Sequence, residues 1–223
     1  MNFKLINNKF WYILLAFCAF LVAMYGLTFR QISYFWFSPF TWNQHQVPAR
    51  IHFITGPIVL ILGIFQFSVS MRKKYPTLHC WLGRIYVLSL LISSGSVFAI
   101  YQYSAYGTVV QVSLLILNII WLLSVLVALF FILVKKNITL HQYWMTRNYA
   151  LTCSAITLRI IFGVLWGILG DQGTAYQIAV ASCYIINIII GEIIIYQYKK
   201  YQIQQNGCFI EKSQDTQNLK INN

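Results

Sequence analysis

The chain has 223 residues, of which 59% are hydrophobic and only 9% are charged, and its formal net charge at pH 7 is +12. A water-soluble domain normally carries about 25% charged residues. The composition therefore excludes an ordinary soluble protein and indicates an integral membrane protein. The excess of basic residues does not indicate nucleic-acid binding, because these residues are spread over separate loops instead of being gathered on one face.

Six apolar segments are long enough to cross a bilayer, whose hydrocarbon core of about 30 Å needs roughly 20 apolar residues per helix. They cover residues 10–29, 51–70, 85–103, 109–134, 149–169 and 175–198. The sequence therefore predicts an all-α, polytopic membrane helix bundle with six transmembrane helices, in a domain of residues 1–200. Residues 201–223, which are rich in Gln, Asn and Lys, are expected to form a disordered cytoplasmic tail.

The basic residues are distributed unevenly between the two ends of these segments. Twelve of them lie in the terminal segments and in the loops that follow the second and fourth apolar segments, whereas the opposite side has only Arg30 and Arg50. By the positive-inside rule, both the N-terminus and the C-terminus are expected in the cytoplasm. The first segment is longer than the apolar region of a signal peptide and lacks a small-residue cleavage site, so it is expected to stay as an anchor.

A seven-residue phrase occurs twice, near the start of the third and the fifth apolar segments. Its two copies, KKYPTLH and KKNITLH, end at His79 and His141, which are 62 residues apart. Because the two copies occupy the same kind of turn, the second and third segments and the fourth and fifth segments would form two parallel helical-hairpin repeats. Thr77 and Thr139 are expected to be the N-caps, which places both histidines in the first helical turn.

The two repeated histidines are candidate axial ligands of one b-type haem. Neutral imidazole is the metal-binding form, the positive end of a helix disfavours its protonation, and bundle interiors are common cofactor sites. His79 and His141 would bind the iron, Arg84 and Arg147 would meet the propionates, and a quinone or a redox protein would be the partner. The simpler alternative is that the histidines bond only water, lipid or a neighbouring helix, and that the arginines bind lipid phosphate.

A second hypothesis needs no haem and uses the ionisable residues inside the apolar segments. His52, Arg159 and Glu192 would form the intramembrane polar site of a carrier or sensor, since such residues are functional candidates in a membrane. Arg159 and Glu192 are at similar depths from the inner side, so a buried ion pair between them is predicted. The alternative partners of Arg159 are Asn118, Gln66 or a backbone carbonyl. A third hypothesis is a structural assembly subunit with no site.

Helical spacing predicts which residues face the interior of the bundle. From His141, the same helical face carries Asn148, Thr152 and Arg159. From His52, it carries small residues including Gly56 and Gly63, and these glycines are expected to be contact points for another helix instead of room for a cofactor. The five cysteines include no CxxC pair, so no disulfide framework is expected. No catalytic motif of a soluble enzyme is present, and enzyme activity stays open.

Three stretches of the chain resemble a known family. The runs RIHFITGPIVLILGIFQF, LHCWLGRIY and HQYWMTRNYALTCSAITLRI, all within residues 50–166, are similar to a family of predicted bacterial integral membrane proteins of unknown function. The resemblance implies a multi-helix protein of the bacterial inner (cytoplasmic) membrane, and it implies no particular reaction. The family pattern often has arginine after each helix-start histidine, whereas Cys80 and Gln142 stand there in this chain. The positions that match the pattern are His52, His79, Gly83, Arg84, His141, Trp144, Met145, Arg147 and Arg159.

Overall fold

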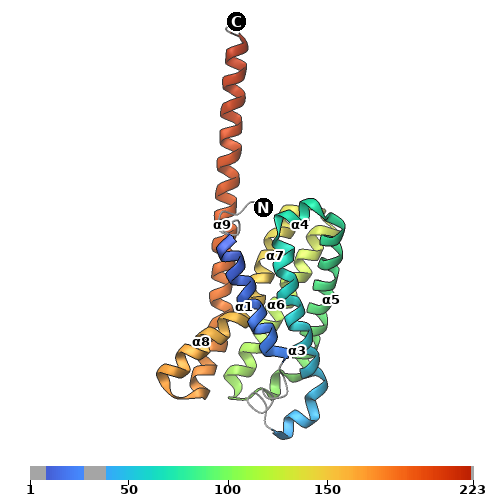
Figure 1. Ribbon diagram of the computed structural model, residues 1–223, viewed down its shortest axis with the longest axis vertical. Coiled ribbons are helices and arrows are strands. Elements are labelled where there is room, and N and C mark those ends of the chain that lie inside the picture. The colour runs from blue at the N-terminus through green and yellow to red at the C-terminus, as the bar shows by residue number, and fades with distance from the viewer. Residues whose placement is uncertain (1–8, 28–38, 222–223) are drawn as a thin grey trace.

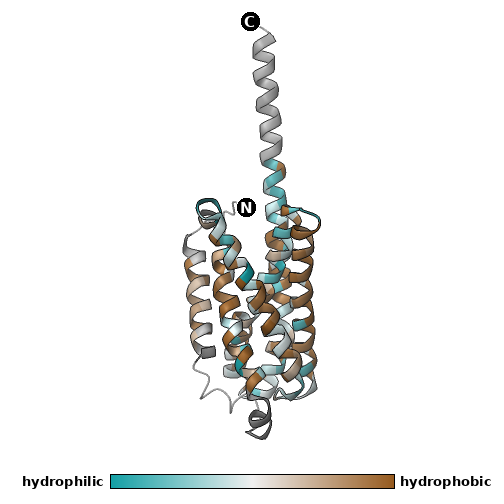
Figure 2. Ribbon diagram, turned by 90° about the vertical axis from the view of Figure 1, so that its right-hand side faces the viewer, coloured by the Kyte–Doolittle hydropathy of each residue, from teal (hydrophilic) through white to brown (hydrophobic). Residues whose placement is uncertain are grey.

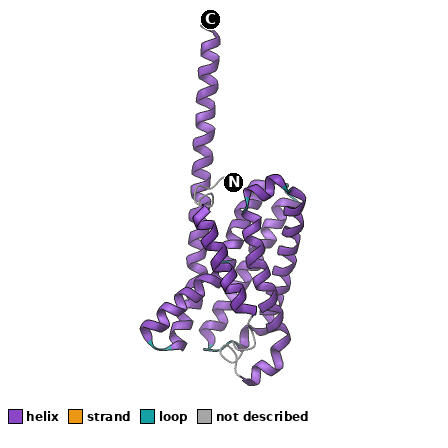
Figure 3. Ribbon diagram, in the orientation of Figure 1, coloured by secondary structure: helices purple, strands orange, loops and turns teal. Residues whose placement is uncertain are grey.

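The computed structural model describes residues 9–27 and 39–221, and every regular element in these ranges is helical (Figure 3). The helices form a bundle from which the end of the last one projects (Figure 1). In chain order the elements are α1 (Lys9–Leu27), α3 (Pro39–Phe67), α4 (Val69–Lys74), α5 (Pro76–Ile100), the 3₁₀ turn η1 (Tyr101–Tyr103), α6 (Thr108–Leu133), α7 (Ile138–Thr152), α8 (Ser154–Leu169) and α9 (Gln172–Ile221).

Five stretches in the described part of the chain are long and apolar enough to cross a membrane. They are Val47–Phe67, Pro76–Tyr103, Thr108–Leu133, Ile138–Leu169 and Gln172–Gln204. α1 adds a shorter apolar stretch, Ile13–Val22. Figure 2 shows hydrophobic residues along the bundle, and hydrophilic residues at its ends and where α9 leaves it. The predicted all-α membrane bundle is confirmed, and the predicted count of six spans is approximate, because five stretches of the described residues are long enough to cross and α1 contributes only the shorter one.

The helices of the third and fifth apolar segments begin earlier than their hydropathy suggests. α5 starts at Pro76, whose fixed backbone and missing N–H suit the first position of a helix. α7 is capped by Asn137, whose side chain accepts a hydrogen bond from the backbone N–H of Leu140 at 3.0 Å. The prediction of Thr77 and Thr139 as N-caps is therefore wrong, because a proline and an asparagine before them already begin the helices.

The two hairpins are α3 with α5 and α6 with α7. They contact each other at a pair of residues that are 62 apart, the same spacing that separates the two copies of the repeated phrase. The hydroxyl of Tyr86 in α5 donates to Oδ1 of Asn148 in α7 at 2.6 Å, and these two residues are 62 apart. A residue contacts its own equivalent only near the axis that relates two repeats. The structure thus shows the predicted repeats as an approximate symmetry with Tyr86 and Asn148 at its axis.

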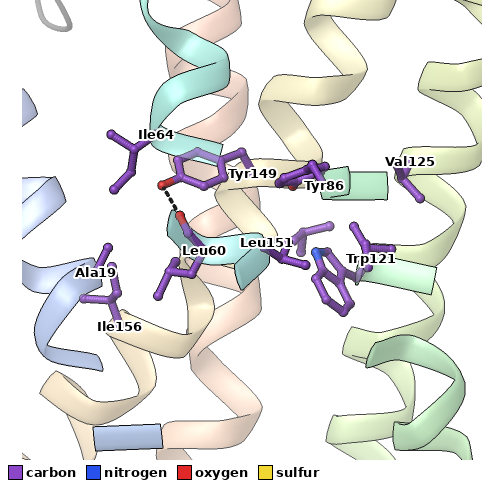
Figure 4. Packing of buried hydrophobic residues seen from close by; sticks show 11 residues of the cluster. Ala19, Leu60, Ile64, Tyr86, Trp121, Val125, Tyr149, Leu151 and Ile156 are labelled. Carbon is purple, nitrogen blue, oxygen red and sulfur yellow. Dashed lines mark hydrogen bonds between the residues drawn. The ribbon is translucent and has the colours of Figure 1, made fainter. Parts of the chain in front are cut away.

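The same buried centre holds the main hydrophobic cluster, drawn in Figure 4. Tyr149 of α7 lies across α3 there, and its hydroxyl donates to the carbonyl of Leu60 at 3.1 Å. Its ring occupies the space that a side chain at Gly63 would fill. The prediction that this glycine is a contact point for another helix is confirmed, since only a residue without Cβ lets α3 and α7 approach so closely.

The symmetry between the hairpins ends at Cys153. α5 continues as one helix, whereas its counterpart is interrupted between α7 and α8. The hydroxyl of Thr152 donates back to the carbonyl of Asn148 at 3.0 Å, a bond that bends helices. Beyond this break α8 leans away from α6 and packs against α9 (Figure 1).

The end of α9 differs from the sequence-based expectation. Residues 201–221 continue α9 as a helix that projects beyond the bundle (Figure 1), whereas a disordered tail is predicted. Gln, Lys and Glu are good helix formers, and a helix already nucleated in the preceding span extends at little cost. The division between a domain of residues 1–200 and a tail stays a prediction.

Candidate functional site

A cavity of about 250 Å³ lies in the half of the bundle that carries η1. Its walls come from α1, α3, the end of α5, η1, α6, the α7–α8 break, α8 and the start of α9. It occupies the space between α6 and α8, where α8 leans away. The lining is mostly apolar, as in most small-molecule sites. The polar and aromatic residues that line it are His52, Phe53, Tyr101, Ser104, Asn118, Trp121, Thr152, Ser154, Arg159 and Tyr176.

His52 reaches this cavity from α3. Its Nδ1 atom lies 2.9 Å from the hydroxyl oxygen of Ser93 in α5, which fixes the orientation of the half-buried ring. The ring also meets Phe53 edge-on, with the centroids 5.7 Å apart. With Nδ1 engaged by Ser93, the other ring nitrogen, Nε2, is the one left for a molecule in the cavity.

Arg159 reaches the same cavity from α8. Its Nη1 atom donates to the carbonyl of Ala155 one turn earlier, which holds the half-buried side chain along its own helix. Arg159 and His52 are near enough to interact electrostatically. None of the described residues that line the cavity is acidic. The cavity therefore combines two basic groups with an apolar wall.

A buried hydrogen-bond network forms the floor of the cavity. The indole N–H of Trp121 donates to the hydroxyl of Thr152 at 2.9 Å, and the amide of Asn148 donates to the carbonyl of Trp121 at 2.9 Å and to the hydroxyl of Ser124 at 2.8 Å. Tyr86 completes the network through its bond to Asn148. Fully bonded polar networks of this kind rigidify a core. The floor is therefore held in one arrangement.

Glu192 does not belong to this site, and the predicted ion pair between Arg159 and Glu192 is wrong. The carboxylate of Glu192 is bound by Arg147, with Nε to Oε1 at 2.5 Å and Nη2 to Oε2 at 3.0 Å. Gly191 lets α9 approach α7 at this level, since a Cβ there would lie only 3.2 Å from the Cβ of Ala150. The estimate from depth failed because it did not give the level at which α8 meets α9. Asn187 of α9 donates to the hydroxyl of Thr157 of α8 at 2.8 Å, so in this antiparallel pair Arg159 faces residues of α9 before Asn187, whereas Glu192 lies beyond it and opposite α7.

The two repeated histidines occupy equivalent places, as predicted, but lie outside the cavity. Each is the fourth residue of its helix, and its backbone N–H bonds the residue before that helix, Tyr75 for His79 and Asn137 for His141. Nδ1 of His141 is 2.9 Å from the carbonyl of Ala128, whereas Nδ1 of His79 is buried and has no hydrogen-bond partner among the described residues.

The two arginines expected to meet haem propionates lie against tryptophan rings in the structure. In the ranges that the structure describes, no group of three or more His, Cys, Asp or Glu residues could hold a metal ion. The guanidinium groups of Arg84 and Arg147 each lie 4.7 Å from the ring centroid of a tryptophan, Trp81 and Trp144 respectively. Haem ligation by His79 and His141 with Arg84 and Arg147 stays a sequence-based prediction.

Sequence reasoning missed several residues of the cavity. Asn118 was named only as an alternative partner of Arg159, and Trp121 and Ser154 were not identified. The available signal was Asn118 itself, the one asparagine in the largely apolar segment 109–134, because a polar residue buried in a membrane helix requires a partner. Tyr101 and Tyr176 gave no signal, since tyrosine is common at both membrane interfaces.

The comparisons with known proteins agree with this architecture. Residues 49–195 match the family described as "Predicted membrane protein (DUF2306)", and this range covers most of the two hairpins, the cavity lining except Val22, and most of the membrane-spanning part of α9. No curated protein and no solved structure matches the chain. The chain therefore belongs to the DUF2306 family of predicted membrane proteins, a domain of unknown function.

Proposed function

We propose that the protein is a membrane carrier or sensor without haem, and that it binds a small amphipathic acid in the cavity between α6 and α8. The observation that carries the proposal is the presence of His52 and Arg159 in one mostly apolar cavity whose described lining has no acidic residue. An arginine inside a membrane helix costs about 2.5–3.5 kcal/mol on insertion scales. Binding an anion is a use that offsets this cost.

The chemistry of the lining fits an acid with an apolar chain. An arginine guanidinium can donate two parallel hydrogen bonds to a carboxylate, and Nε2 of His52 can donate a third. The chain of the ligand would lie against leucines of three helices, Leu60, Leu117 and Leu158, all of which line the cavity. Binding of this kind needs no reaction, so a carrier or a sensor is favoured over an enzyme.

The test compares three probes that share an eight-carbon chain, octanoate, octylamine and 1-octanol, titrated by calorimetry into the protein in lipid nanodiscs. We expect saturable binding of octanoate that is at least about tenfold tighter than that of octanol, a difference of about 1.4 kcal/mol, and no saturable binding of octylamine. Empty nanodiscs correct for partition into lipid. Equal binding of all three probes, or no saturable binding of any, would contradict the proposal.

Arg159→Met should remove the preference for octanoate over octanol, because the variant keeps the volume of the side chain and loses its charge. Arg159→Lys should keep part of the preference, since a point charge remains without the two parallel donors. Arg84→Met is the matched control, because it also removes one positive charge, from an exposed side chain that lies outside the cavity. It should leave the preference unchanged.

We also propose that the protein lies in the bacterial inner membrane with Lys73 and Lys136 on the cytoplasmic side, so that the cavity is near the opposite surface. The distribution of basic residues supports this orientation. In a cysteine-free background, a membrane-impermeant maleimide should label Thr108→Cys in intact cells and Lys136→Cys only after permeabilisation. The reverse pattern would show that the orientation is inverted.

A further inference from the structure

Asn118 is a buried residue of the cavity wall with half of its amide group unused. It is 3% exposed, and its Nδ2 atom donates to the carbonyl of Ser94 in α5 at 3.2 Å. This bond fixes the orientation of the amide, because only the nitrogen can donate to a carbonyl. Its Oδ1 atom is buried and has no hydrogen-bond partner among the described residues. A buried acceptor without a donor is costly, so such groups normally have a partner.

Ser154 is a second such residue, on the opposite wall. It is the first residue of α8, it is 1% exposed, and its hydroxyl has no partner in the part of the chain that the structure describes. Serine hydroxyls within a helix commonly bond a carbonyl one turn earlier, as that of Ser182 does in α9. The hydroxyl of Ser154 lies instead at the α7–α8 break, where the wall of the cavity begins.

Asn118 and Ser154 need a hydrogen-bonding partner in the cavity that a simple carboxylate does not supply. Oδ1 of Asn118 only accepts hydrogen bonds, and an ionised carboxylate has no donor. An ammonium group would supply donors, but the positive charge of Arg159 disfavours it in the same cavity. A hydroxyl group near the carboxylate supplies a neutral donor for Asn118 and can also bond the hydroxyl of Ser154.

We infer that the acid bound in the cavity carries a hydroxyl group close to its carboxylate, and that Asn118 and Ser154 recognise this hydroxyl. The inference rests on the proposed function, because it specifies the class of ligand for the same cavity. His52 and Arg159 bind the carboxylate, the hydroxyl bonds Asn118, and the leucines contact the chain. The ligand class is therefore an amphipathic hydroxy acid.

The test uses octanoate, 2-hydroxyoctanoate and 3-hydroxyoctanoate, titrated by calorimetry into the wild-type protein in lipid nanodiscs. A site with a buried acceptor discriminates against the analogue that leaves this acceptor unpaired. We expect one of the two hydroxy acids to bind at least about fivefold tighter than octanoate, although its hydroxyl makes it more soluble in water. This comparison needs no variant, so it does not depend on how a substitution folds.

Two variants then assign the preference to the two residues. Asn118→Leu keeps the shape of the side chain and removes the acceptor, so it should abolish the preference for the hydroxy acid while octanoate still binds. Ser154→Ala should reduce the preference. Gly95→Ala, at a position with nothing within 4 Å of the added Cβ, is the control and should leave it unchanged.

The outcomes separate this inference from the proposed function. Saturable binding of octanoate with no gain from either hydroxyl would overturn the inference and leave the proposed function in place, and would indicate that water satisfies Asn118 and Ser154. A preference that survives in both variants would overturn their assignment. No saturable binding of any acid would overturn both proposals.

Discussion

The two hairpins of the bundle start alike and end differently. At the end that carries the two Lys-Lys phrases, α5 and α7 begin with their histidines in the same place, and they meet at Tyr86 and Asn148. Farther along, α5 remains one helix packed on α3, whereas the second hairpin breaks at Cys153 and α8 leans outward. The cavity lies only where the second hairpin departs from the first. A local change in one copy of a repeat is therefore sufficient to create a site.

The lining of the cavity shows the same asymmetry in its chemistry. Three pairs of lining residues, each with one member in either hairpin, are separated by the repeat spacing of 62, which indicates that the cavity is close to the axis between the hairpins. The pairs are His52 and Leu114, Gly56 and Asn118, and Val97 and Arg159. In each pair one member is polar and the other is not. A ligand would therefore find different partners on the two sides and bind in one orientation.

The largest effect is expected from separating the hairpins at Gly63. Gly63→Val should reduce the free energy of unfolding by about 3 kcal/mol, the upper end for overpacking, because the new side chain meets the ring of Tyr149. The ring cannot move away freely, since its hydroxyl bonds Leu60 and the residue is buried. Unfolding in detergent micelles, followed by circular dichroism, measures the loss.

A second substitution shows whether the ring is the cause. Tyr149→Leu removes the ring and should recover part of the loss when combined with Gly63→Val. Gly95→Ala, on a face of α5 with open space, is the control and should leave the stability nearly unchanged. If the losses from Gly63→Val and Tyr149→Leu are additive, the two residues are not in contact.

A smaller effect is expected at the axis itself. Tyr86→Phe removes the hydroxyl that bonds Asn148, and both residues are fully buried. Hydrogen bonds between membrane helices average about 0.6 kcal/mol and reach about 1.7, and an acceptor left unpaired adds to the cost. We expect a loss near 1.5 kcal/mol in the same unfolding measurement. A loss as small as that of Tyr101→Phe, in the η1 turn, would show that the axis contact contributes nothing.

The ion pair between Arg147 and Glu192 is expected to contribute still less to the free energy of unfolding. Arg147 and Glu192 are 27% and 49% exposed, and partly exposed pairs contribute at most about 1 kcal/mol. A double-mutant cycle with Arg147→Met and Glu192→Gln should give a coupling near 0.5 kcal/mol. The matched cycle with Arg159→Met and Glu192→Gln should give none, because α8 meets α9 at Thr157 and Asn187, and Arg159 and Glu192 lie on opposite sides of that level. Coupling in the second cycle alone would restore the pair predicted from the sequence.

The features that hydropathy and repetition encode could be predicted from the sequence. These include the spans, the hairpin repeats, the helix-start positions of His79 and His141, and the interior face that carries Asn148 and Thr152. The break at Cys153 could not be predicted, because the apolar segment around it continues without a proline or a glycine.

The partner of Glu192 depended on the level at which α7 and α8 face α9. Helical rise gives depth along the membrane but not which neighbour is close, and α9 is closest to α7 where Gly191 permits it. The cavity combines residues from eight elements, and its shape follows from the lean of α8. The lean of α8 results from its packing against α9. No local sequence pattern predicts this tertiary contact.

The smallest effect is expected at the turn that joins α8 to α9. This turn follows the second hairpin. The carboxylate of Asp171 accepts hydrogen bonds from the backbone N–H groups of Thr174 at 3.0 Å and Gly173 at 3.2 Å. It therefore caps α9 just before Tyr176, which lines the cavity. Hydrogen bonds from the Thr174 side chain and from these backbone groups hold the pKa of Asp171 below its ordinary value.

Because the pKa of Asp171 is lower in the folded protein than in the unfolded chain, ionised Asp171 stabilises the folded state at neutral pH. This contribution is present above the ordinary pKa of an aspartate and is lost as the pH falls through the lowered, folded-state value. Asp171→Asn keeps the capping geometry and removes the charge, so its melting temperature should lie slightly below that of the wild type at pH 7. The difference should shrink to nothing as the pH falls through the acidic range. A difference that stays constant with pH would show that the charge of Asp171 does not contribute, and that its capping bonds alone support the start of α9 beside the cavity.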